Sequence, residues 1–521
     1  MPPPRTLPLA LGLYLLVAAS YALTGPGRID SIDGQFRFEV ASNLLDHGAP
    51  VLLDPYLPDG IGRDAAIGRV SGYGAAASLA GVPLLVLGRL LGLAEVEAQR
   101  FLFSWTSALV GALVPTVQLL VHRALGLAPA RALGWALVTA FATLLWPGSL
   151  TVLDQAQHAA WLLVAMASAW WAGRSGSLGP AVVAGLAMGW LVNHQELYVA
   201  ALPGVLLALV PDLRDRQAWR RAIPPALLIC GGLGLGLLGW SAWNAWRMGD
   251  PTVSGKGETL VLRNPLVGLA SLALSPGKGA LWYSPPVLLA LLGLPGLIKV
   301  APALVRGVLL ALAPVLLIYA SMPFFGGDWC WGPRYLLPAL ALLGLAMPFA
   351  TTGGLPGRAL LIAVVGAGLL VQLLGISLDH HRFFFHHALR AFFYDGDPWV
   401  YWRISALLER PGELLDSLRW SLLEASRFGG HPFAGQLTYA TWPLQPVEEA
   451  ERMSRSLAVF YLPRPWPLWF PVQPEAVATP VPLGTTTAAL GAVAVAGLIL
   501  LRHGLGASTS ASAPTGRDGP R

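Results

Sequence analysis

Charged residues are scarce in this chain, and their scarcity determines its class. Only 12% of the 521 residues are charged and 55% are hydrophobic, whereas soluble domains carry roughly 25% charged residues. No basic block resembles a nucleic-acid site, and the alternation of apolar and polar residues found in membrane β-barrels is missing. The composition therefore predicts a helical membrane protein.

Cysteine is also scarce, with two residues in the whole sequence. Cys230 lies in an apolar stretch and Cys330 in a connecting segment, and these different settings predict that the two do not form a disulfide. Neither has the CxxC or Cys/His spacing of a zinc site. The sequence shows no internal repeat.

Long apolar stretches recur along most of the sequence, and each matches the roughly 20 residues that a helix needs to cross about 30 Å of hydrocarbon. The pattern predicts an all-α fold, a polytopic transmembrane helix bundle of about twelve spans. The predicted spans are 7–24, 100–121, 131–149, 157–173, 178–192, 197–210, 222–243, 281–298, 307–322, 334–350, 358–378 and 485–501.

The charge of the connecting segments predicts their orientation. Short segments that hold most of the loop arginines and lysines alternate with long ones rich in acids, Trp, Tyr and Pro, and short basic loops face the cytoplasm. The long segments 25–99, 244–280 and 379–484 are therefore expected outside. We interpret the apolar run 74–93 as a helix that dips into the membrane, because a further full span would move the basic segment 122–131 outward.

The same pattern divides the chain into four parts. Residues 1–378 form the transmembrane region with its long first outer loop, and 379–484 form a small outer cap rich in aromatic residues. Residues 485–502 form the last transmembrane helix, and the tail 503–521 has too little apolar surface to fold. Residues 1–24 are alternatively a cleaved signal peptide, since they carry a small-residue cleavage pattern.

Two carboxylates follow the first span, where a helix should leave the membrane. Asp30 and Asp33 precede apolar residues that alternate with polar ones, as on an amphipathic helix lying along a membrane surface. Ionisable groups beside hydrocarbon are costly unless they are hydrated, paired or functional. The position predicts a functional role for these acids, with a helix N-cap as the alternative for Asp33.

Other polar residues gather at the predicted outer ends of the spans. These residues are Asp154 and His158, then His194 and Glu196, then Asp328 in the segment GGDWCWGPRY, and His380 after the eleventh span. For Asp154, at the start of the fourth span, a helix N-cap remains the alternative. For His194 and Glu196, between the fifth and sixth spans, the alternative is that they only form hydrogen bonds with buried backbone groups of a tight turn. The histidines at 380, 381, 386 and 387 are interpreted as part of an interfacial aromatic belt, and no metal site is predicted.

Arg334 opens an apolar span after a Gly-Pro break. Its planar guanidinium suits a bidentate grip on a phosphate or carboxylate, and snorkelling to the interface is the alternative. The segment 244–280 adds Lys256, Arg263 and Lys278 as candidate phosphate ligands. Glycines flank Lys278 as in a phosphate-contacting turn, although the Walker A spacing is absent.

The order of these features resembles the GT-C superfamily of polytopic glycosyltransferases, which includes protein O-mannosyltransferases and bacterial lipid A aminoarabinose transferases. The resemblance covers roughly residues 7–210 and is weaker up to 378. The family often has a second acid beside its loop Asp, where this chain has Gly34. The matching elements are Asp33 in the first outer loop, a membrane-dipping helix later in that loop, Arg100 opening the next span, Asp154 after the third span, and Trp-Gly-Pro-Arg-Tyr at 331–335.

The resemblance implies transfer of a sugar from a polyprenyl-phosphate donor to a protein, lipid or glycan acceptor, with an active site on the extracytoplasmic side of a bacterial-type cytoplasmic (inner) membrane. We expect one-step inverting transfer with Asp33 as general base and with Asp154, the second catalytic residue, orienting the sugar or acceptor together with His158. No cofactor and no nucleic-acid partner are predicted, and a divalent cation is compatible with the family. The donor phosphate is expected to contact Arg334, Lys278, Arg263 and Lys256, and the substrate cavity is expected to include Asp30, His158, His194, Glu196, Asp328 and His380.

Other functions remain open from the sequence. A transporter or flippase for a lipid-linked or anionic solute would also place polar residues at helix ends, but inverted repeats and paired broken helices are not evident. A non-catalytic assembly factor that docks its partners on the outer cap predicts that the outer acids can be changed freely. An O-antigen-ligase-like enzyme with a diphosphate-linked donor is a variant of the enzyme interpretation.

Overall fold

The protein is described by a computed structural model for residues 6–53, 62–253, 255, 263–327, 330–350, 353–378, 380, 383, 399–415 and 483–509. The candidate residues Lys256 and Asp328, and most of the predicted cap, lie outside these residues. The described residues are predominantly helical and form the polytopic bundle that the sequence predicts. Neither Cys230 nor Cys330 forms a disulfide, as predicted.

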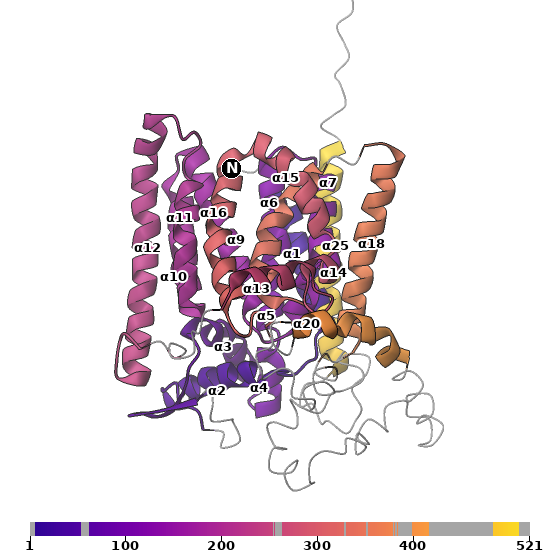
Figure 1. Cartoon of the computed structure of the whole chain (residues 1–521). Coiled ribbons are helices and arrows are strands. Elements are labelled where there is room, and N and C mark those ends of the chain that lie inside the picture. Colours follow the sequence, from indigo (N-terminus) through magenta and orange to yellow (C-terminus); the bar gives the residue numbers. More distant parts are fainter. Residues whose placement is uncertain are drawn as a thin grey trace, which may run out of the picture.

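Long helices pack side by side in the bundle (Figure 1). Six helical segments of the described part are long and apolar enough to cross a membrane, and each coincides with a predicted span. They are α1 (Thr6–Thr24), the continuous run of α4 (Val96–Phe103), α5 (Thr106–Gly111) and α6 (Leu113–Ala124), then α12 (Arg216–Met248), α16 (Pro302–Ser321), α18 (Gly354–Ser377) and α25 (Leu483–Thr509).

The remaining predicted spans correspond to shorter or interrupted helices, except for α9, which is a single helix of 21 residues. Proline contributes to the interruptions, as in the last of these segments, where Pro338 and Pro348 fall among successive short helical turns. The elements are α7 (Pro129–Ala142) with α8 (Leu145–Leu150), α9 (Gln155–Ser175), α10 (Leu178–His194), η1 (Glu196–Ala201) with α11 (Leu202–Leu207), α14 (Ala280–Tyr283) with α15 (Val287–Val300), and η3 (Arg334–Leu336) with α17 (Leu337–Leu343) and η4 (Gly344–Phe349).

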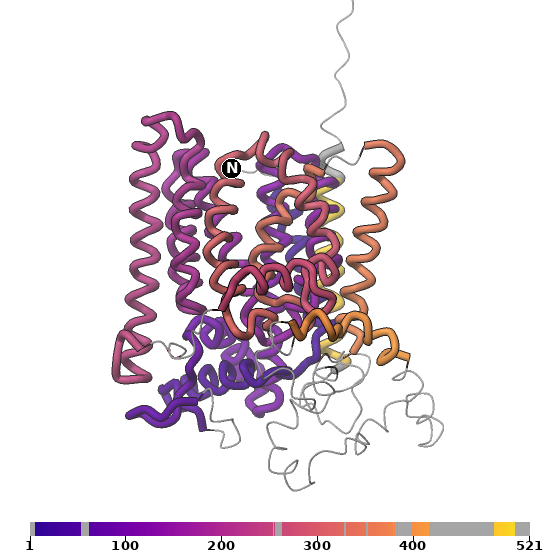
Figure 2. Tube along the Cα trace, in the orientation of Figure 1, coloured from indigo at the N-terminus to yellow at the C-terminus, as the bar shows by residue number. Residues whose placement is uncertain are grey.

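One end of the bundle, here called the loop end, carries a separate layer of elements (Figure 1). The tube in Figure 2 shows the same layer, and the start of α12 lies at the opposite end. The run 74–93 forms a helix in this layer, as predicted. The layer contains α2 (Ile32–His47), the antiparallel hairpin β1 (Gly62–Ala65) and β2 (Gly68–Ser71), α3 (Ala75–Leu90) and α4, with α13 (Pro265–Leu274) and α20 (Val400–Arg403) nearby.

Small residues allow close helix contacts inside the bundle. A Cβ added at Gly189 of α10 would lie 2.5 Å from the carbonyl oxygen of Gly232, and one added at Gly236 would lie 2.2 Å from Gly189 Cα. Lipid provides little hydrophobic drive for helix association, so backbone approach of this kind stabilises a membrane bundle. Helix α1 packs against α25 in the same way through Gly12 and Gly497.

Candidate active site

The structure brings Asp33 and Arg334 together at the loop end, although they are 301 positions apart in the sequence. Asp33 Oδ2 lies 3.9 Å from Arg334 Nη1, and the two side chains are 23% and 12% exposed. Ser31 is the N-cap of α2, because its Oγ accepts a hydrogen bond from the Gly34 amide. The N-cap alternative for Asp33 is therefore wrong, and its carboxylate is available for contacts with the bundle.

Tyr73 holds the other oxygen of the same carboxylate. Its hydroxyl donates a hydrogen bond to Asp33 Oδ1. Burial and the nearby Asp33 charge raise the pKa of Tyr73 well above its ordinary value, so the phenol stays protonated and remains a donor. Asp33 therefore has a neutral donor on one oxygen and a cation near the other.

Aromatic rings position Arg334 at the start of η3. Its guanidinium carbon lies 5.1 Å from the centroid of the Tyr335 ring, and that ring stacks on Tyr319 with 4.5 Å between centroids. Tyr319 in turn donates a hydrogen bond to Gln195 Oε1 over 2.7 Å. The guanidinium therefore rests on a stacked platform, which limits snorkelling away from the site.

The structure places the other candidate phosphate ligands differently. Lys278 is buried, and its Nζ donates to the carbonyl oxygens of Cys330 and Gly332 over 2.7 and 3.1 Å. The ammonium thus supports the segment that leads into Arg334. Arg263 is exposed and its backbone N–H donates to Ser321 O. Direct phosphate contacts of Lys278 and Arg263 stay predictions.

Arg37 is a site residue that the sequence analysis missed. It is buried, and its guanidinium lies 4.8 Å from the centroid of the Tyr73 ring. Its Nη2 donates to Asp154 Oδ2 over 2.9 Å, and its Nη1 donates to Val152 O over the same distance. The sequence signal was a cation four residues after Asp33, on the same face of an amphipathic helix.

Asp154 stands at the start of α9 without capping that helix. Burial would raise the pKa of its carboxyl, but Arg37 and His158 hold the pKa well below its usual range. Asp154 is therefore ionised at neutral pH. Its second oxygen, Oδ1, accepts a hydrogen bond from Gln155 Nε2 over 2.8 Å. Asp154 thus occupies the N-cap position of α9, but its side chain makes no capping hydrogen bond.

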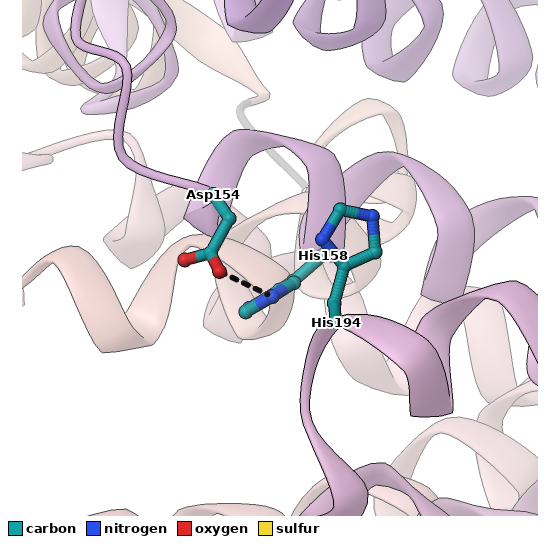
Figure 3. A group of neighbouring side chains, drawn as sticks. All are labelled: Asp154, His158 and His194. Atoms are coloured by element: carbon teal, nitrogen blue, oxygen red, sulfur yellow. Dashed lines mark ion pairs between the residues drawn. The ribbon is translucent and has the colours of Figure 1, made fainter. Parts of the chain in front are cut away.

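His158 and His194 complete a buried group with Asp154 (Figure 3). His158 lies one turn into α9, with Nε2 3.5 Å from Asp154 Oδ2. His194 is the last residue of α10, and its ring meets that of His158 edge to face with 5.1 Å between centroids. The three residues are the only described group of His, Cys, Asp and Glu side chains with mutual ligand distances suited to a metal ion.

The other cavity candidates lie around this centre. Asp30 accepts a hydrogen bond from the Val152 amide over 3.2 Å and lines a small cavity together with His380. A second small cavity is lined by Arg334, and the two share Trp331 as a wall. Glu196 accepts a hydrogen bond from Trp240 of α12 over 3.2 Å. Each of these residues therefore lies against a distant part of the chain, and none forms hydrogen bonds only with the backbone of its own turn.

Position 34 has no room for the second acid that the GT-C family often has beside its loop Asp. A Cβ at this position would lie 2.8 Å from both Ile29 Cγ2 and Val152 Cβ. Helix α2 is pressed here against the segment that precedes α9. A carboxylate at position 34 would therefore displace α2 from the segment that precedes Asp154.

An apolar groove of about 800 Å³ lies in the bundle, next to residues that pack against the site. Helices α3, α9, α10 and α12 form its walls, with Trp161, Trp190 and Trp243 among its lining residues. Trp190 meets the ring of His194 with 6.2 Å between centroids, and Trp243 shares an apolar cluster with Tyr73. Two lining residues of the groove therefore pack near His194 and Tyr73, while Asp33 and Arg334 are not among its lining residues.

No family model matches the chain and no curated protein matches its sequence. Among solved structures, the chain is similar to ArnT from Cupriavidus metallidurans bound to undecaprenyl phosphate, with 15% identity, coverage of 96% of this chain and 78% of that one, and a TM-score of 0.47. ArnT is a membrane glycosyltransferase with the GT-C fold, the class that the sequence resembles.

The chain is also similar to the archaeal oligosaccharyltransferase AglB from Archaeoglobus fulgidus in complex with an inhibitory peptide and a dolichol-phosphate. That similarity has 12% identity, covers 69% of this chain and 55% of that one, and has a TM-score of 0.40. The apo form of the Archaeoglobus fulgidus oligosaccharyltransferase gives 13% identity, coverage of 78% and 57%, and a TM-score of 0.36. The chain thus spans just over half the length of these archaeal proteins.

Proposed function

We propose that the protein is a membrane glycosyltransferase that moves a sugar from a polyprenyl-phosphate donor to an acceptor at the loop end of the bundle. The observation that carries the proposal is the pairing of the partly exposed Asp33 carboxylate with Arg334 beside an apolar groove. A base and an anion-binding guanidinium within one ion-pair distance are the two groups that transfer from a phosphate-linked sugar requires.

In this proposal the donor phosphate binds Arg334 and thereby takes it from Asp33. The freed carboxylate accepts the proton of the acceptor nucleophile as that atom bonds to the anomeric carbon. The bond between this carbon and the phosphate oxygen breaks, and its electron pair leaves with polyprenyl phosphate. Negative charge grows on the leaving phosphate, so Arg334 stabilises the transition state more than the ground state. Displacement in one step inverts the anomeric carbon.

The apolar groove supplies a place for the isoprenoid part of the donor. Its walls are tryptophan, leucine, valine, alanine and glycine residues of four helices, with Asn193 as a polar member at the site end. An isoprenoid has no hydrogen-bonding groups, so it is expected to bind where apolar surface is buried and polar groups are few. The phosphate and the sugar then lie at the loop end.

We place this loop end outside the cytoplasm. The start of α12, with Arg216, Arg220 and Arg221, lies at the other end of the bundle (Figure 1). Short basic segments mark the cytoplasmic side of membrane proteins. The orientation explains the use of a lipid-linked donor, because nucleotide sugars are not available outside the cytoplasm.

Transfer assays with purified protein test the proposal. We expect wild-type protein to move label from at least one member of a panel of radiolabelled polyprenyl-phosphate sugars to extracted envelope acceptors. Asp33→Asn should abolish transfer with the fold intact, because the amide cannot accept the proton. Asp46→Asn is the matched control, since Asp46 is an exposed carboxylate on the same helix, ion-paired with Arg89 over 2.9 Å.

Full transfer by Asp33→Asn would remove the base assignment. Absence of transfer by the wild type with every donor, together with movement of a labelled lipid across vesicle membranes, would favour the transporter alternative.

A further inference from the structure

We propose that Asp154, His158 and His194 bind a zinc ion, at a site that links the start of α9 to the end of α10. The proposal does not depend on the transferase activity, since it rests on the three side chains and their surroundings. All three residues are buried, with exposures of 6%, 0% and 6%. Figure 3 shows Asp154 and His158 directed toward each other, with the His194 side chain beside them.

The distances suit one small cation. One ligand atom from each residue lies within 4.8 Å of the other two, and the contact between Asp154 Oδ2 and His158 Nε2 is 3.5 Å. Tetrahedral zinc with bonds of about 2.0–2.1 Å holds its ligand atoms about 3.3 Å apart. The aspartate and the first histidine therefore already have about this spacing, and zinc would draw in the His194 nitrogen, which lies within 4.8 Å of both other ligand atoms.

The two imidazoles are otherwise unsatisfied. Among the described residues, His158 Nδ1 and both ring nitrogens of His194 have no hydrogen-bond partner, and His158 Nε2 has only the 3.5 Å contact with Asp154. Buried polar groups in native proteins are almost always paired, so two adjacent rings without partners point to a ligand at this place. A metal ion between the two rings would be coordinated by the lone pair of one nitrogen of each ring.

The chemistry of the ligands selects the class of ion. Two imidazoles and one carboxylate suit zinc and similar first-row metals, whereas magnesium and calcium prefer oxygen ligands. Three protein ligands leave a fourth position open, as in zinc sites that bind water or a substrate group.

Neighbouring residues already hold the ligands in place. Arg37 and Gln155 donate to the two carboxylate oxygens of Asp154. Rings of Tyr198 and Trp190 stand against the two histidines with 5.0 and 6.2 Å between centroids. Outer partners of this kind fix the orientation of metal ligands, and they distinguish the group from a chance meeting of side chains.

Metal analysis of the full-length protein tests the inference. The protein is purified in detergent without a polyhistidine tag, stripped with chelator, equilibrated with zinc and freed of loosely bound ion. We expect about one zinc per chain, a higher midpoint of thermal unfolding with zinc than without, and an intense visible absorption band when cobalt replaces zinc. Less than a tenth of an equivalent of zinc, or no such cobalt band, would overturn the proposal.

Variants assign the zinc to these residues. His158→Gln and His194→Gln should each lose the bound zinc and the zinc-dependent rise of the unfolding midpoint. His47→Gln should retain both, because His47 is exposed at the end of α2. Retention of a full equivalent by both site variants would mean adventitious binding elsewhere and would overturn the proposal. If a site variant does not fold, zinc content and the cobalt spectrum of the wild type decide.

Discussion

At the scale of single residues, Asp33 is held by two donors of different chemistry. Tyr73 donates a neutral hydroxyl to one oxygen, and Arg334 places a positive charge 3.9 Å from the other. A phosphate can replace a partly exposed cation at that distance, whereas the tyrosine can stay in place throughout. Tyr73 is therefore a positioning residue, which keeps the carboxylate oriented while Arg334 changes partner.

Replacing Tyr73 with phenylalanine tests this positioning role. The change removes the hydroxyl and keeps the ring beneath Arg37. A hydrogen bond to a charged group contributes about 1.5–3 kcal/mol, so we expect kcat for sugar transfer to fall about 10-fold to 100-fold, with KM for the lipid donor nearly unchanged. Steady-state kinetics measure both constants.

Tyr14→Phe is the matched control, because Tyr14 lies half-buried on α1. The positioning role would be contradicted if Tyr73→Phe kept the wild-type kcat, or if it raised KM with kcat unchanged.

Some residues of this centre can be predicted from sequence and others cannot. Asp33, Asp154 and Arg334 stand out because a charge beside an apolar span is costly and therefore noticeable. Tyr73 and Arg37 look like ordinary residues of a loop and of an amphipathic helix. Their importance arises from tertiary contacts between α2, the α3 entry and the start of α9, and no local pattern records such contacts.

At the scale of elements, the crossing of α10 and α12 determines one wall of the apolar groove. Gly189 and Gly236 both line the groove and also let the two backbones touch. Helix α12 is otherwise largely exposed, with 22% of its apolar window buried. Its attachment therefore depends strongly on this glycine contact.

Gly236→Leu should separate α10 from α12. The new side chain would meet backbone atoms of Gly189 and cannot be accommodated by a rotamer change, and overpacking of this kind costs about 1–3 kcal/mol. We expect a lower midpoint of thermal unfolding in detergent and weaker binding of a polyprenyl phosphate. Gly231→Leu is the control on the same helix, because a Cβ there meets nothing within 4 Å. Equal unfolding midpoints for the two variants would show that the glycine contact does not hold α12.

Sequence patterns predict the long helices more fully than the short ones. The spans that became α1, α12, α16 and α18 are uninterrupted apolar runs, so length and hydropathy define them. The span at 334–350 instead became three short helical pieces, because Pro338 and Pro348 interrupt the backbone pattern.

At the scale of the whole molecule, the bundle separates two chemistries along its axis. The middle of the bundle contains apolar helix faces and the groove. The loop end contains the ion pairs Arg37–Asp154 and Arg334–Asp33, close to α2 and α3. The order of spans could be predicted from charge and hydropathy, but the convergence of residues 33, 154 and 334 required the fold. The division at residue 379 stays a prediction, since most of the segment beyond it lies outside the described residues.

The central claim is that Asp33 and Arg334 share one site in which a phosphate replaces the carboxylate as partner of the guanidinium. The most direct test is the dissociation constant of a polyprenyl phosphate, measured for Asp33→Asn, Arg334→Gln and the surface control Arg89→Gln. We expect Arg334→Gln to weaken binding about tenfold or more, because it removes charge-assisted hydrogen bonds. Asp33→Asn should bind as tightly as the wild type or more tightly, since the competing carboxylate is gone. Weaker binding by Asp33→Asn, or unchanged binding by Arg334→Gln, would contradict the account.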